Sequence, residues 1–77
     1  MILVDGLSII DLKNADRIYI VTGSKDCILT VVFQNGYIEK KIQIDKEIAK
    51  KLINYIALVK NKDVVEDLND LIPKLKD

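Results

Sequence analysis

Residues 27–44, CILTVVFQNGYIEKKIQI, decide the fold of this chain. Apolar side chains alternate with polar ones on both sides of Asn35-Gly36, and this dipeptide tolerates the positive φ angles of a two-residue type I′ turn. We therefore expect a β-hairpin built from residues 27–33 and 37–44. Its expected pairs are Phe33 with Ile38, Val31 with Lys40, and Leu29 with Ile42.

Three segments upstream of this hairpin also favour extended structure. Asp5-Gly6 separates the apolar residues 1–4 from residues 7–10, which is a second hairpin signal. Residues 11–16 are polar and predict a connection with one short helical turn. Residues 17–22 are rich in the β-branched and aromatic side chains that strands prefer. About five short strands joined in sequence order predict an antiparallel β-meander.

Downstream of Asp45 the apolar residues recur with a helical period of about 3.6 instead of two. Asp45 is a good N-cap, so we expect one helix from there to about residue 60. A second helix is expected from Asp63, because Asp63 and Glu66 have the spacing of a capping box. Pro73 should end or kink this helix, since proline has no backbone N–H. The apolar stripe of the second helix would consist of Val64, Val65, Leu68, Leu71, Ile72 and Leu75.

The predicted fold class is therefore α+β, in a single small domain that spans residues 1–77. Residues 1–44 are expected to form an antiparallel β-meander of about five strands. Residues 45–77 are expected to form two C-terminal amphipathic α-helices packed on one sheet face. Two helices cannot cover both faces of the sheet, so we expect the opposite face to remain free.

The charge balance argues against a strongly anionic partner. Twelve basic residues are matched by twelve acidic ones, and Arg17 is the one arginine. Arginine makes most bidentate phosphate and guanine contacts, so its scarcity disfavours nucleic acid as the partner. The chain shows no basic segment followed by the apolar core of a signal peptide, and no apolar run near the roughly 20 residues of a membrane span. We therefore expect a cytoplasmic protein that does not bind a membrane.

Side chains that carry catalysis are scarce. The chain has no histidine and no serine in a nucleophile-elbow pattern, and its one cysteine, Cys27, excludes an intramolecular disulfide. Gly6, Gly23 and Gly36 each suit a turn rather than a phosphate-binding loop. Cys27 occupies a core-facing strand position, where a thiol acts as a small buried hydrophobe. We expect no catalytic residue, no metal site, no cofactor and no enzymatic activity.

The alternation along the strands assigns each residue to one of two faces. The residues that face the predicted core include Cys27, Leu29, Val31, Phe33 and Ile38. Lys40 lies on the same side and is a polar exception that we expect at the edge of the helix layer. The opposite face is more apolar and aromatic than contact with water requires, which predicts a contact surface. The residues expected to bind a partner there are Arg17, Tyr19, Val21, Ile28, Val32, Tyr37, Glu39 and Lys41.

Two functions fit this free face. A surface with tyrosines, aliphatic side chains and few charges suits a protein interface, so we expect a small regulator or inhibitor that acts by protein–protein contact. Part of the surface would serve homodimerisation. The alternative is a single-stranded nucleic-acid-binding protein, in which Tyr19 and Tyr37 stack on bases while Arg17 and Lys41 neutralise phosphates.

A second candidate patch lies on the predicted helices. Leu58 falls on the polar side of the first helix. Four acidic residues share one side of the predicted second helix, namely Asp63, Glu66, Asp67 and Asp70. These acids suit either a docking site for a basic partner or a solvated face whose first-turn carboxylates favour the helix dipole.

Overall fold

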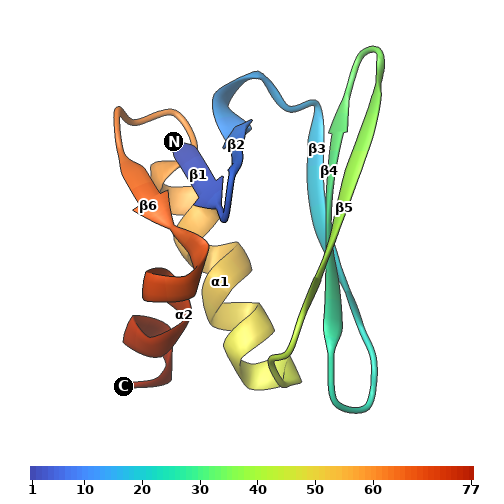
Figure 1. Ribbon diagram of the computed structural model, residues 1–77, viewed down its shortest axis with the longest axis vertical. Helices are drawn as coiled ribbons and strands as arrows, with labels where there is room; N and C mark the ends of the chain where they lie inside the picture. The colour runs from blue at the N-terminus through green and yellow to red at the C-terminus, as the bar shows by residue number, and fades with distance from the viewer.

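Two three-stranded β-sheets and two α-helices make up the computed structural model, which describes residues 1–77 (Figure 1). Sheet A has the strand order β2-β1-β6, and sheet B has the order β3-β4-β5. Sheet A contains β1 (Ile2–Asp5), β2 (Ser8–Asp11) and β6 (Val65–Asp67). Sheet B contains β3 (Arg17–Thr22), β4 (Cys27–Phe33) and β5 (Gly36–Ile42). The helices are the short 3-10 helix η1 (Leu12–Asn14), α1 (Lys46–Val59) and α2 (Leu68–Lys76).

The predicted α+β class is confirmed, but the prediction of one five-stranded meander is wrong. β1 and β2 form their own hairpin, and η1 turns the chain away before β3 begins. Asp11 stabilises this turn, because its carboxylate accepts hydrogen bonds from Lys13 N at 3.1 Å and from Asn14 Nδ2 at 2.6 Å. Leu12 in η1 is fully buried and anchors the turn in the core. Strand pairing therefore stops at Asp11 and restarts in a second sheet.

The chain after α1 forms a strand where a helix was predicted to begin. β6 pairs in parallel with β1, with Leu3 opposite Glu66, so the helix expected from Asp63 is wrong. The β-branched pair Val64-Val65 favours a strand, and β1 offers a sheet edge to receive it. The N-cap lies four residues after the predicted one, at Asp67, whose carboxylate accepts a hydrogen bond from Asn69 N at 2.8 Å, and α2 begins at Leu68.

Two helix predictions have opposite outcomes. Asp45 caps α1 as expected, since its Oδ1 accepts a hydrogen bond from Ile48 N at 2.9 Å. Pro73, however, lies inside α2, which continues to Lys76. Pro73 has no backbone N–H to donate to the carbonyl of Asn69. Because Asn69 is exposed in the first turn of α2, water can donate to this carbonyl instead.

β4 and β5 pair in a register that lies two residues away from the predicted one. No residue other than glycine has a positive φ, so Gln34 and Asn35 form the loop with ordinary backbone angles, and the predicted type I′ turn at Asn35-Gly36 is wrong. A shift of two residues leaves every side chain on its predicted face, because strand side chains alternate with a period of two. The observed pairs include Val32 with Tyr37, Val31 with Ile38, Thr30 with Glu39, and Leu29 with Lys40.

The first hairpin also turns one residue later than predicted. Asp5 pairs with Ser8, so Gly6 and Leu7 form the two-residue loop in place of Asp5 and Gly6. Gly6 has a φ of +58°, and glycine at the first loop position is typical of a type II′ turn. The loop leaves Leu7 fully exposed at its tip.

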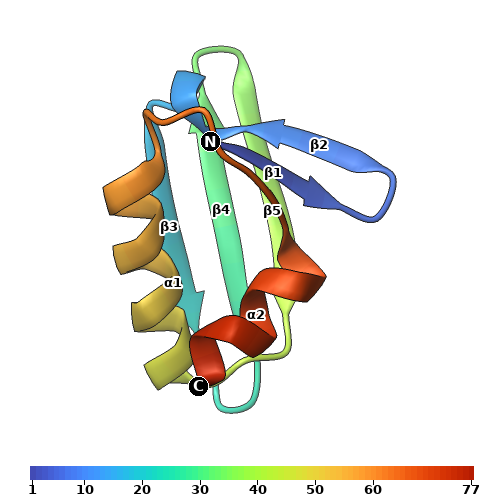
Figure 2. The ribbon, with the colours of Figure 1, turned by 90° about the vertical axis from the view of Figure 1, so that its left-hand side faces the viewer.

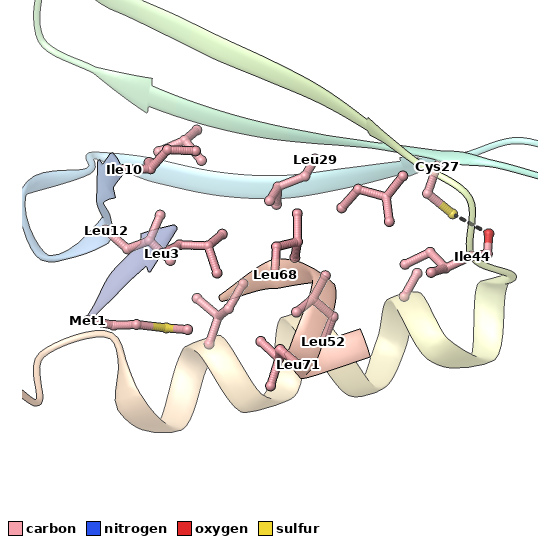
Figure 3. Packing of buried hydrophobic residues seen from close by; sticks show 14 of the residues in the cluster. Met1, Leu3, Ile10, Leu12, Cys27, Leu29, Ile44, Leu52, Leu68 and Leu71 are labelled. Atoms are coloured by element: carbon pink, nitrogen blue, oxygen red, sulfur yellow. Dashed lines mark hydrogen bonds between the residues drawn. The ribbon is translucent and has the colours of Figure 1, made fainter. Parts of the chain in front are cut away.

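The core lies between sheet B and a layer formed by both helices and the β1–β2 hairpin. Figure 2 shows α1, α2 and this hairpin in front of sheet B, so all three lie on the same side of it. Sixteen buried residues form one hydrophobic cluster between the layers. Figure 3 shows Leu3, Leu52 and Leu68 pointing into it from β1, α1 and α2. The predicted core positions Cys27, Leu29 and Val31 are confirmed, since each is only 1% exposed.

Lys40 lies on the core side of β5, as predicted, and the structure gives it a partner. Its Nζ lies 2.9 Å from Oδ2 of Asp5, whose side chain is only 15% exposed. This ion pair joins the edge strand β5 of sheet B to β1 of sheet A. Phe33 and Ile38, also predicted to face the core, lie near the end of the β4–β5 hairpin, which extends past the helices in Figure 1. Phe33 is therefore half-buried and Ile38 exposed.

A hydrogen bond from Tyr55 fastens α1 to β6. The phenolic O–H donates to Oε2 of Glu66 at 2.8 Å, and Lys74 Nζ lies 4.0 Å from the other carboxylate oxygen of Glu66. This hydrogen bond, partial burial and the negative charge of Glu66 all raise the pKa of Tyr55 above its usual value of 10.0. Tyr55 therefore holds its proton more tightly in the folded protein than in the unfolded chain.

We expect Tyr55→Phe to lower the free energy of unfolding by about 1 kcal/mol at pH 7, because it removes one hydrogen bond to a carboxylate. The raised pKa means that the contribution of Tyr55 is fully present below about pH 10 and is lost as the pH rises through the higher pKa of the folded state. Urea unfolding of both proteins at pH 7, 9 and 11 checks this. The difference between them should be constant up to pH 9 and shrink at pH 11; a difference unchanged at pH 11 would contradict the assignment.

Candidate functional site

The face of sheet B that points away from the helices carries nine side chains in three rows of three. The register of β3, β4 and β5 sets the rows, and residues paired across strands share a face. Moving from β3 to β4 to β5, the rows are Arg17, Val32 and Tyr37; Tyr19, Thr30 and Glu39; and Val21, Ile28 and Lys41. We call this set of nine the outer face of sheet B.

All eight residues predicted to bind a partner lie together on this outer face, with Thr30 at its centre. Thr30 is 2% exposed and is the one buried residue of this face. Around it, Tyr37 is 67%, Val21 53% and Ile28 36% exposed. Three exposed apolar side chains thus lie around a buried centre. Its role in binding stays a prediction.

The charges on the outer face are partly neutralised within the chain. The guanidinium of Arg17 lies over the ring of Tyr19, 4.6 Å from its centroid. Lys41 Nζ lies 3.1 Å from Oδ2 of Asp26, in the loop between β3 and β4. Arg17 and Glu39 take part in no ion pair within the chain. Two opposite charges are therefore available to a partner, one on each edge strand of sheet B.

The second predicted patch is dispersed by the structure. Asp63 lies in a loop, Glu66 and Asp67 lie in β6, and Asp70 lies in α2, so the four acids do not share a helix face. Glu66 is occupied by Tyr55, and Asp67 caps α2. The prediction was wrong because β6 replaces the first turn of the expected helix. Leu58 lies on the solvent side of α1 and is 74% exposed, as its position in the helical pattern predicts.

Sheet A also leaves one face open, and this surface was missed in the sequence. The continuous meander placed β1 in the same sheet as β3, whereas β1 is the central strand of a separate sheet. Ile9 and Val65 on this face are 72% and 67% exposed. The available signal was that residues 1–4 are apolar at every position, instead of alternating. The residues of this outer face of sheet A are Ile2, Val4, Ile9, Asp11, Val65 and Asp67.

Cys27 lies in the core, as expected from its strand position. It is 1% exposed, and its S–H donates to the carbonyl oxygen of Ile44 at 3.4 Å (Figure 3). The structure gathers no group of three or more Cys, Asp or Glu side chains that could hold a metal ion.

None of the helices is long and apolar enough to cross a membrane. Comparisons of the chain with models of protein families, with curated proteins and with solved structures found no significant match.

Proposed function

We propose that this chain is a non-enzymatic interaction module, a small regulator or inhibitor that acts by protein–protein contact through the outer face of sheet B. The observation that carries the proposal is the set of exposed apolar groups, Val21, Ile28 and Tyr37, on the sheet face that no helix covers. Aromatic and aliphatic groups with few charges are typical of the centre of a protein interface. The tyrosines supply large contact areas at little cost in side-chain entropy.

The contacts of the charged residues favour a protein over a single-stranded nucleic acid. Arg17 already lies over the ring of Tyr19, and Lys41 is paired with Asp26. A base would have to displace Arg17 to stack on this face of Tyr19, and a phosphate would have to compete with Asp26 for Lys41. Glu39, in the middle row, would repel the phosphates. A protein surface with matching apolar groups needs no such rearrangement.

A photo-crosslinking residue tests the surface directly. We would replace Tyr37 with p-benzoylphenylalanine, which keeps an aromatic side chain at this exposed position, and use Lys51, on the exposed side of α1, as the control position. In cells that make the protein, irradiation should give covalent protein adducts at position 37 and few at position 51. Equal yields at both positions, or no adduct at position 37, would contradict the proposal.

Surface variants give the matching loss of function. Val32→Lys and Tyr37→Glu, made separately, should each lower the affinity for the crosslinked partner about tenfold or more, because each places a charge among interface groups that lose water on binding. Ile9→Lys, on the outer face of sheet A, is the matched control and should bind normally. Circular dichroism should show that all three variants are folded. Binding that survives both sheet B substitutions would exclude this face.

A further inference from the structure

The two charges without an ion pair on the outer face of sheet B lie on opposite edge strands. Arg17 is on β3 and Glu39 is on β5, with β4 between them. The third charged side chain, Lys41, is neutralised by Asp26 at 3.1 Å. The face therefore carries one positive charge without an ion pair on β3, one negative charge without an ion pair on β5, and the apolar residues Ile28 and Val32 on β4 between them.

The position of Arg17 brings these two charges into the same row. Its guanidinium lies over the ring of Tyr19, which belongs to the middle row with Thr30 and Glu39. The backbone of Arg17 belongs to the neighbouring row, but its guanidinium therefore lies in the middle row, on the β3 side. Glu39 lies in the same row, on the β5 side. Thr30, small and buried, lies between the two charges.

We propose that the partner of this face is a second copy of the chain, packed sheet against sheet about a two-fold axis that runs along β4. This inference rests on the proposed function and names its partner. Rotation about that axis places β3 of one copy over β5 of the other and β4 over β4. Arg17 of each copy then faces Glu39 of the second copy, so the ion pair forms twice. Ile28 and Val32 pack against the same residues of the second copy.

The charges select this axis over the other symmetric choice. A two-fold axis perpendicular to the strands would place the middle row of one copy opposite the middle row of the second copy. Glu39 would then face Glu39 of the second copy, and the Arg17 guanidinium over Tyr19 would face its own equivalent. Like charges placed opposite each other oppose association. Sheets packed face to face keep their strands roughly aligned, about 10 Å apart, a separation that long Arg and Glu side chains can span from both sides.

The size of the face determines the strength of the contact. Three strands about 4.8 Å apart and about 20 Å long cover roughly 300 Å² in projection. A standard interface buries about 800 Å² on each partner, so this dimer should be weak and reversible. We expect it to form at chain concentrations between about 10 µM and 1 mM.

Charge exchange tests this arrangement by sedimentation velocity of the full chain between 10 µM and 1 mM. Arg17→Glu and Glu39→Arg should each lower the association constant about tenfold, because each turns two attractive pairs into two repulsive ones. The double variant Arg17→Glu with Glu39→Arg restores opposite charges and should associate within about threefold of the wild-type chain. Lys51→Glu, on the exposed side of α1, is the matched control and should not change association.

The inference would be overturned by a chain that stays monomeric at 1 mM, or by a dimer whose association constant neither single exchange lowers. Failure of the double variant to recover association would equally reject the pairing of Arg17 with Glu39. A monomeric chain that still gives adducts of a different protein at position 37 would remove this inference and leave the proposed function in place. Absence of both self-association and adducts would remove both.

Discussion

Leu52→Ala should lower the free energy of unfolding by about 3–4 kcal/mol, the largest single effect that we expect. Leu52 lies in the middle of α1 and is 0% exposed, packed between that helix and sheet B among residues from β1 and α2 (Figure 3). Truncation removes buried methyl groups and leaves a cavity that rigid neighbours cannot fill. In a domain of this size, the melting temperature should fall by about 15–25 °C.

Leu58→Ala is the matched control for this substitution. Leu58 is in the same helix and undergoes the same chemical change, but it is 74% exposed. We expect a change in stability within about 0.5 kcal/mol, partly offset by the higher helix propensity of alanine. Urea unfolding of the two variants and the wild-type chain measures both values. Comparable losses would show that α1 presents a different face to sheet B.

Leu68→Ala should cost about 3 kcal/mol, whereas Val65→Ala should change stability by less than about 0.5 kcal/mol. Leu68 opens α2 and is 2% exposed in the core, while Val65 lies in β6 on the outer face of sheet A and is 67% exposed. In the helix predicted from the sequence, both residues belong to one apolar stripe and both would be buried. The pair of variants therefore distinguishes the strand from the predicted helix.

Thermal and urea unfolding of these two variants provides the measurement. A large loss in both would support a helix that begins at Asp63 and would remove β6 from the fold. A large loss in Leu68→Ala alone supports the parallel pairing of β6 with β1. Hydrogen exchange adds an independent check, because the amide of Ile2 donates to the carbonyl of Val64 at 2.7 Å and should be protected.

The strands of sheet B and the two faces of that sheet follow from local sequence alone. β3 and β4 have the predicted bounds, and the apolar alternation in β4 assigns Leu29 and Val31 to the core. The turn was predicted one residue too late and the register was wrong by two. The assignment of side chains to the two faces is nevertheless correct, because a shift of two residues leaves every side chain on the same face of the sheet. For the same reason, the eight residues predicted for the interface do share a face.

Tertiary pairing decided the features that local pattern could not show. Val64-Val65 fits either the apolar stripe of a helix or a short strand, and only the edge of β1, over 60 positions earlier in the chain, selects the strand. The same long-range pairing separates the acidic residues and places Glu66 where its carboxylate accepts a hydrogen bond from Tyr55. The ion pair of Asp5 with Lys40 likewise depends on how the two sheets pack.

The sequence by itself thus determined the fold class, the first helix and its cap, the strands of sheet B and the composition of its outer face, because period and capping are properties of neighbouring residues. Only the tertiary structure decided that there are two sheets, that β1 is a central strand, and that the charge of Arg17 shares a row with Glu39. These features depend on contacts between residues far apart in the chain. Local periodicity carries no information about which distant edge a strand will meet.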